Sequence, residues 1–203
     1  KNTENTDGNG LFSNWLSPTK YPTPTPTPLP EVRISNAGDL LIDGDYDTAY
    51  REYQLGSTQT TDPELVASSM LGMGRALLLK KDYYGAVNQF SSLLMSYPDG
   101  ESRNKAFFFI AKAYDALEQY RLAADAYASY LAVVPSPLNS EINEMRGDSL
   151  MNYGDYAGAY SVYEAALASA TGSRYEQLQL KIAQAATAAG NTDSAIKDRK
   201  SVV

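Results

Sequence analysis

The chain has 203 residues, of which 43% are apolar, and its formal net charge is −7. This acidic excess argues against nucleic acid as a partner, because phosphates bind to basic surfaces. Cysteine and histidine are absent, which excludes disulfides, thiolate chemistry and histidine-based metal sites.

Residues 1–30 are predicted to form an arm that precedes the rest of the chain. The first ten residues are polar and show no periodicity, and they are followed by an apolar cluster with the spacing of one helical turn. This cluster contains the only tryptophan of the chain and consists of Leu11, Phe12, Trp15 and Leu16. Two interpretations stay open: the cluster folds back and caps the body of its own chain, or it docks into another molecule.

A proline- and threonine-rich tract, YPTPTPTPLP, occupies residues 21–30 of the arm. Each proline fixes its own φ angle and keeps the preceding residue extended, so the tract is expected to form polyproline II. At about 3.1 Å per residue it spans roughly 28 Å as a stiff spacer. This composition is typical of O-glycosylated stalks, with Thr23, Thr25 and Thr27 as candidate sites, although a bare linker has the same composition.

From residue 31 onward the same landmarks recur about every 37 residues, which is the signature of a solenoid. Each full copy has a small residue, an apolar or aromatic residue, a tyrosine, an alanine and a second aromatic. The copies are Ala37, Leu40, Tyr46, Ala49 and Tyr53; Gly74, Leu77, Tyr83, Ala86 and Phe90; Ala111, Tyr114, Tyr120, Ala123 and Tyr127; and Gly147, Leu150, Tyr156, Ala159 and Tyr163. A weaker last copy has Ala183, Ala186, Thr192 and Ala195.

These landmarks predict helix pairs that pack closely. The small residues let two helices approach each other, and the first tyrosine of each copy fills the wedge where the two helices part. One pair cannot bury its apolar face alone, whereas stacked pairs can. The expected helices are 31–43, 46–56, 64–80, 83–97, 101–117, 120–133, 139–153, 156–170, 174–189 and 192–198, so residues 31–203 form the solenoid.

The last copy breaks the pattern at residues 197–203, where no aromatic landmark follows. We therefore expect the last helix to be incomplete. The solenoid then lacks the polar capping helix with which such folds normally end. An apolar face is then available to a partner, formed by Leu178, Leu180, Ile182 and Ile196. Alternatively, the chain is part of a longer protein.

The landmark spacing of residues 31–198 resembles the tetratricopeptide repeat (TPR) family. Met70 and Phe107 stand where the early tryptophan of that motif is found, and the period is slightly longer than usual. The resemblance implies an all-α, right-handed α-solenoid of about five helix-turn-helix repeats with an extended Pro/Thr-rich N-terminal arm. In that family the first helix of each repeat lines a groove that binds peptides or helices. The corresponding groove residues here are Leu71, Arg75, Leu78, Phe108, Lys112 and Met151.

Within this groove Arg75 and Lys112 occupy equivalent positions in adjacent copies. They can hold a carboxylate or peptide carbonyls, although long basic side chains are also commonly just solvated.

No catalytic constellation is visible in the sequence. A Ser–His or Cys–His pair is excluded, and there is no Gly-rich phosphate loop. Asp43, Asp45 and Asp47 are spaced like part of a calcium loop, but the repeat register makes this segment an ordinary interhelical turn. Glu141 and Glu144 are expected to be solvated. We expect a non-enzyme with no cofactor and no metal, and no apolar run approaches the length that spans a bilayer.

Two functions agree with these features. In the first, the chain is the subunit of an extracellular or surface filament, joined head-to-tail because Leu11, Phe12, Trp15 and Leu16 dock on the next copy. In the second, it is a cell-envelope adaptor that binds a protein or peptide in its groove, since Tyr97-Pro98-Asp99 before a helix resembles the repeats of periplasmic envelope proteins. The chain begins at Lys1, from which we expect an exported, processed protein at the cell surface, outside the cell or in the periplasm.

Overall fold

The computed structural model describes residues 27–134 and 138–190, and this part of the chain folds into nine α-helices. They are α1 (Pro30–Asp43), α2 (Tyr46–Thr58), α3 (Pro63–Leu79), α4 (Tyr83–Ser96), α5 (Glu101–Ala116), α6 (Tyr120–Val133), α7 (Asn139–Tyr153), α8 (Tyr156–Leu167) and α9 (Ser173–Ala188). Each of these helices was predicted from the sequence, with bounds that differ by three residues or fewer. The tenth expected helix, 192–198, lies outside the described residues.

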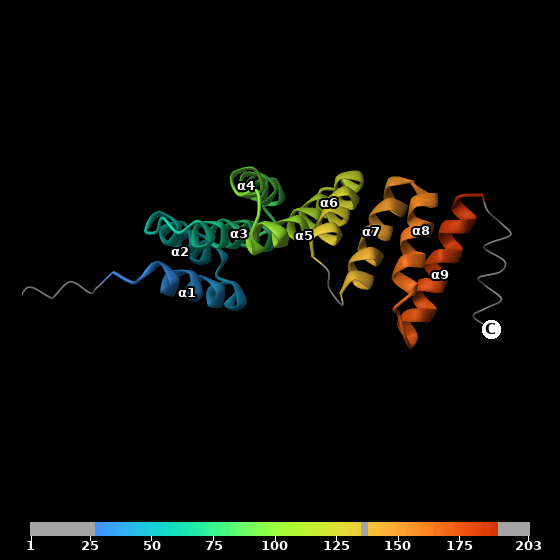
Figure 1. Ribbon diagram of the computed structural model, residues 1–203, viewed down its shortest axis with the longest axis horizontal. Coiled ribbons are helices and arrows are strands. Elements are labelled where there is room, and N and C mark those ends of the chain that lie inside the picture. The colour runs from blue at the N-terminus through green and yellow to red at the C-terminus, as the bar shows by residue number, and fades with distance from the viewer. Residues whose placement is uncertain (1–26, 135–137, 191–203) are drawn as a thin grey trace, which may run out of the picture.

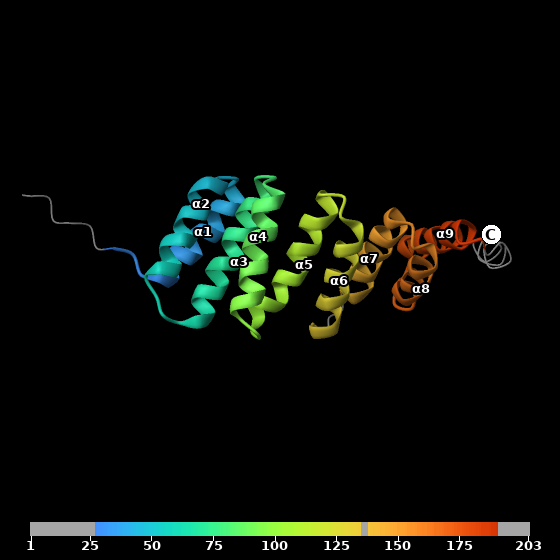
Figure 2. The same ribbon diagram turned by 90° about the horizontal axis from the view of Figure 1, so that it is seen from above.

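The helices form a single row in which each one packs against the next in sequence. Figures 1 and 2 show this row running from α1 at one end to α9 at the other. In Figure 1 α4 is seen nearly end-on whereas α7 and α8 stand across the long axis in the plane of the picture, so the row twists along its length. Helix α3 also contacts α1 and α5. This is the all-α solenoid of helix-turn-helix repeats that the sequence predicted.

The turn inside each repeat has the same backbone conformation. The residue directly before the N-cap of the second helix has a positive φ angle in every copy, at Gly44, Lys81, Glu118 and Gly154. Glycine adopts this left-handed conformation readily, whereas lysine and glutamate do so at a cost. The turn therefore closes the repeat even in the two copies that lack glycine.

An aspartate then begins the second helix in three of the four copies. The Asp45 carboxylate accepts a hydrogen bond from the backbone N–H of Thr48 at 3.2 Å, and Asp82 and Asp155 cap α4 and α8 in the same way. These bonds satisfy N–H groups that have no partner inside the helix. The Asp43–Asp47 segment is accordingly an interhelical turn, and the described residues contain no cluster of three or more acidic side chains placed to bind a metal ion.

Glycine lets the two helices of a repeat approach closely. A Cβ atom at Gly74 would lie under 3.0 Å from the ring of Phe90, and one at Gly147 would lie equally close to the ring of Tyr163. Both rings are almost completely buried. The small and aromatic landmarks of the repeat therefore meet in space, as their spacing predicted.

The apolar face expected at the C-terminal end is largely absent. Leu178 and Ile182 are 0% and 2% exposed, because they pack against α8 around Tyr163 and Ala166. Only Leu180 is exposed, at 55%, and Ile196 lies outside the described residues. Helix α9 thus turns its apolar stripe toward the preceding repeat. Within the described ranges no helix is long and apolar enough to cross a membrane.

Candidate functional site

A polar groove of about 360 Å³ lies where α5, α6 and α7 meet. It is lined by Lys112, Asp115, Tyr120, Tyr127, Met145, Asp148, Ser149 and Asn152. Lys112 is exposed, whereas Asp115 and Asp148 are half-buried. The groove thus offers one cationic side chain above a floor of carboxylates and hydroxyls.

Asp115 is the central hydrogen-bond acceptor of the polar groove. The Tyr127 hydroxyl donates to its Oδ2 atom at 2.9 Å, and the Ser149 hydroxyl donates to its Oδ1 atom at 2.6 Å. One carboxylate therefore connects α5, α6 and α7. Burial and the adjacent negative charge of Asp115 raise the pKa of Tyr127 far above its usual range, so this hydroxyl stays a hydrogen-bond donor.

An aromatic pocket of about 210 Å³ lies one turn before Lys112 and is lined by Lys105, Phe108, Phe109 and Tyr130. The Phe108 ring centroid is 5.3 Å from that of Phe109 and 5.8 Å from that of Tyr130. These distances are typical of favourable aromatic pairs. Phe108 is half-buried, so the pocket that it lines is open to solvent on one side.

The other predicted groove residues have different surroundings. Leu71 is only 7% exposed and belongs to the core, so it offers little surface to a partner. Leu78 packs against that same core, and Met151 packs against the core around Tyr163. The Arg75 guanidinium lies 5.3 Å from the centre of the Phe109 ring, a cation–π contact that holds it on its own protein. Lys112 lines the polar groove and Phe108 the aromatic pocket, whereas neither cavity is lined by Arg75.

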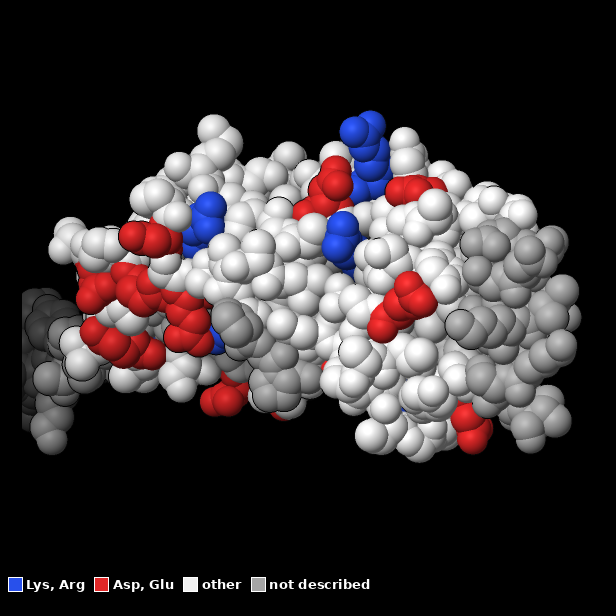
Figure 3. All heavy atoms as spheres, turned by 45° about the vertical axis from the view of Figure 1, so that its right-hand side comes forward, with Lys and Arg blue, Asp and Glu red and all other residues white. Residues whose placement is uncertain are grey.

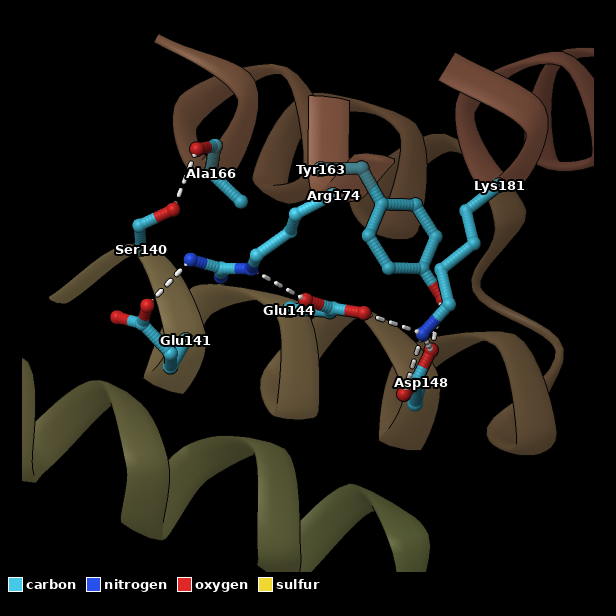
Figure 4. Close-up of polar contacts among 8 residues, drawn as sticks. All are labelled: Ser140, Glu141, Glu144, Asp148, Tyr163, Ala166, Arg174 and Lys181. Atoms are coloured by element: carbon cyan, nitrogen blue, oxygen red, sulfur yellow. Dashed lines mark hydrogen bonds and ion pairs between the residues drawn. The ribbon is translucent and has the colours of Figure 1, made fainter. Parts of the chain in front are cut away.

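An ion-pair ladder joins α7 to α9, and its side chains are drawn in Figure 4. Arg174 donates to Glu141 and, at 3.2 Å, to Glu144. Lys181 donates to Glu144 at 2.9 Å and to Asp148 at 2.7 Å. The expectation that Glu141 and Glu144 are simply solvated is therefore wrong, because α9 places two cations above the acidic face of α7.

The ladder shifts the pKa values of its members. Burial alone would raise the pKa of Glu144, but the hydrogen bonds and charges of Lys181 and Arg174 lower it below its usual value. Burial would likewise lower the pKa of Lys181, but Asp148 and Glu144 raise it. Tyr163 completes the network by donating to Asp148 at 2.6 Å.

An apolar cleft of about 320 Å³ lies between α4 and α6, above α5. It is lined by Ser91, Leu94, Met95, Phe107, Ile110, Tyr114, Asp125, Ala126 and Ser129. At its edge Met95 is 86% exposed. Sequence reasoning did not identify this cleft, although Phe107, Ile110 and Tyr114 recur at the spacing of one helix face.

The predicted arm sites fall mainly outside the described residues. This holds for the apolar cluster Leu11, Phe12, Trp15 and Leu16 and for the candidate glycosylation sites Thr23 and Thr25. Thr27 is described and is exposed. Figure 3 shows acidic side chains gathered toward the N-terminal end of the face that it presents.

Paired antiparallel helices in a row, close small-to-aromatic contacts and grooves between neighbouring repeats define a TPR-like α-solenoid. No protein-family model and no curated protein sequence matches the chain, but solved structures do. A crystal structure of MamA protein is 17% identical, covers 85% of this chain and 89% of its own, and superposes with a TM-score of 0.68. MamA 41-end from Desulfovibrio magneticus RS-1 is 17% identical, with coverages of 85% and 92% and a TM-score of 0.67. BtubC (BKLC) from P. vanneervenii is 15% identical, with coverages of 82% and 75% and a TM-score of 0.65. Identities this low show a shared fold alone.

Proposed function

We propose that this chain is a non-catalytic protein-binding scaffold that assembles head-to-tail with further copies of itself through its N-terminal arm. The observation that supports this is the exposed apolar cleft between α4 and α6, which offers the solenoid body a surface that an apolar segment can cover. The arm supplies such a segment at Leu11, Phe12, Trp15 and Leu16. A contact between an arm and a different surface on the next copy is heterologous, and it produces fibres when the rotation between successive copies does not close a ring.

Deletion of residues 1–20 tests this function. The truncated chain should remain helical, because every helix in the described residues begins at or after Pro30, and it should sediment as a monomer. The full chain at the same concentration should give larger species in sedimentation velocity and fibres in negative-stain images. Fibres formed equally well by the truncated chain would contradict the proposal.

The assembled protein is proposed to lie outside the cell or at its surface, with the Pro/Thr tract facing solvent. The composition of that tract and the exposure of Thr27 support this placement. Glycans on Thr23, Thr25 or Thr27 would add hexose-sized increments to the intact mass of natively purified protein. An intact mass equal to that of the bare chain would contradict the glycan part of the proposal.

A cell-envelope adaptor is a second candidate, and the observation that favours it is the polar groove beside the aromatic pocket. An exposed Lys112 next to the half-buried Phe108 can bind an acidic or apolar side chain of a partner peptide. Lys112→Glu should then abolish capture of that partner while preserving helicity. A self-assembled particle whose formation is unaffected by Lys112→Glu would favour the filament instead.

A further inference from the structure

The apolar cleft is a surface that the repeat fold does not fill. Its floor is formed by Phe107, Ile110 and Tyr114 of α5, while Leu94 and Met95 of α4 form one wall. Exposed apolar side chains that line a concave surface are a common feature of protein-binding sites. A methionine at the rim adds an adaptable contact, since its unbranched side chain fits different partners.

The lining of the cleft also contains polar groups from both α4 and α6. Asp125, Ser91 and Ser129 contribute side chains to its lining, and Asp125 is exposed. An indole ring suits this arrangement, because its apolar body can lie on the floor while its N–H donates to a carboxylate or hydroxyl at the rim. The volume of about 320 Å³ is sufficient for a large aromatic side chain with one neighbour.

The chain itself carries a matching segment. Residues 8–19 contain no charged side chain, so they can approach the acidic solenoid without charge repulsion. Trp15 is the only tryptophan of the protein, and the sequence spacing of Leu11, Phe12, Trp15 and Leu16 is that of one face of a helical turn.

The arm starts in a direction that leads away from its own cleft. Leu29 has φ −62° and ψ 152°, which are polyproline II values. In Figures 1 and 2 residues 27–29 extend from the free end of α1 along the long axis, opposite to the side on which α4 and α6 lie. Because alternating prolines favour an extended chain, the sequence of residues 21–30 is expected to hold the apolar cluster away from its own solenoid.

From these observations we infer that the apolar cleft between α4 and α6 binds residues 11–16 of a second copy of this chain, with the Trp15 side chain on the floor formed by Phe107, Ile110 and Tyr114. This inference rests on the proposed function, because it names the surface that receives the arm. Each copy donates one arm and offers one cleft, so the contact repeats along a line.

Fluorescence of the full chain tests the inference directly, because Trp15 is the only tryptophan and its emission reports only its own surroundings. Emission should shift to shorter wavelength as the protein concentration rises, in parallel with an increase in light scattering. Met95→Glu should weaken both effects at least about 10-fold in concentration. Met95 is 86% exposed, so this variant should keep the circular dichroism spectrum of the wild type.

Tyr84→Glu is the matched control. Tyr84 is 67% exposed on the same helix, is not among the cleft residues, and receives the same added charge. It should assemble like the wild type. Trp15→Ala should fail to assemble alone, yet a mixture of Trp15→Ala and Met95→Glu chains should form a one-to-one pair and stop there, because only one working arm and one working cleft meet.

The outcomes separate the inference from the function on which it rests. A short-wavelength emission that does not depend on concentration would place the arm on its own solenoid and overturn the inference. Full assembly of Met95→Glu together with failure of Trp15→Ala would also overturn the inference, while leaving arm-mediated assembly intact. Full assembly of chains lacking residues 1–20 would overturn the proposed function itself.

Discussion

At the scale of single residues, the space around each glycine decides what the repeat tolerates. Gly147 faces the ring of Tyr163, which is 2% exposed and donates its hydroxyl to Asp148. The ring is held by packing on its faces and by a hydrogen bond at its tip, so it has little freedom to move. Gly38, at the start of the solenoid, has more space, because a Cβ atom there would meet only the Tyr53 hydroxyl, at 3.7 Å.

Gly147→Ala should therefore destabilise the protein. The added methyl group overpacks against Tyr163 at a cost of about 1–3 kcal/mol, which the higher helix propensity of alanine offsets only in part. Urea unfolding followed by circular dichroism measures the effect. Gly38→Ala is the matched control and should stabilise by about 0.5–1 kcal/mol, because its methyl group meets ordinary contact distances. Equal effects of the two substitutions would contradict the packing argument.

At the scale of elements, an aspartate N-cap starts the second helix in three of the four repeats. The caps are Asp45 for α2, Asp82 for α4 and Asp155 for α8. The N-cap residue of α6 is Gln119, whose side chain makes no capping hydrogen bond. Gln119 nevertheless has nearly the same backbone angles as Asp82, with φ −88° and ψ 58° against −82° and 76°. The backbone at Gln119 thus already has the conformation of a capped helix start, although the glutamine side chain supplies no cap.

Gln119→Asp should supply this cap. The shorter carboxylate can accept the backbone N–H of Leu122, as Asp82 accepts that of Gly85 at 3.0 Å. We expect a gain of about 0.5–1 kcal/mol in the free energy of unfolding, measured by thermal or urea denaturation. Gln119→Asn should give a similar cap without the charge, and Gln119→Ala should give none. A stabilisation by alanine as large as that by aspartate would show that capping is not the cause.

At the scale of the whole molecule, ion pairs add to the apolar packing at the C-terminal end of the row. Aromatic and aliphatic side chains from α3 to α7 form one continuous core. Between α7 and α9, by contrast, Arg174 and Lys181 reach across to Glu141, Glu144 and Asp148. The C-terminal end of the solenoid therefore combines the apolar contact of α9 with α8 and an electrostatic contact with α7.

The stability contribution of Lys181 should accordingly depend on pH. The pKa of Glu144 is lowered from 4.5, so its stabilising effect is present above pH 4.5 and is lost as the pH falls through the lower folded value. The pKa of Lys181 is raised from 10.5, so its effect is present below pH 10.5 and is lost as the pH rises through the higher folded value. Lys181→Gln should cost about 1 kcal/mol at pH 7 and progressively less as the pH falls below 4.5 through the folded pKa of Glu144, as measured by urea unfolding at a series of pH values. Lys80→Gln is the control, because its ion pair with Asp47 is largely exposed and should contribute little at any of these pH values.

The candidate sites show which surface features the sequence pattern predicts and which it does not. The register predicted that Phe108 and Lys112 line surfaces on the first helix of their repeat, and they line the aromatic pocket and the polar groove. It did not predict that Arg75 rests on Phe109 or that Asp115 joins three helices. Phe109 and Ser149 belong to the neighbouring repeats of Arg75 and Asp115, and their approach depends on how far each repeat is rotated against the next.

The sequence by itself determined the number, approximate bounds and pairing of the described helices between Pro30 and Ala188, because small-to-aromatic contacts, turn residues and capping aspartates all act within one repeat. Only the tertiary structure decided which surfaces stay open. The burial of Leu178 and Ile182, the ladder between α7 and α9 and the apolar cleft between α4 and α6 all arise where separate repeats meet. The physical reason is that local periodicity specifies which face of a helix is apolar, whereas the angle between stacked repeats specifies what covers that face.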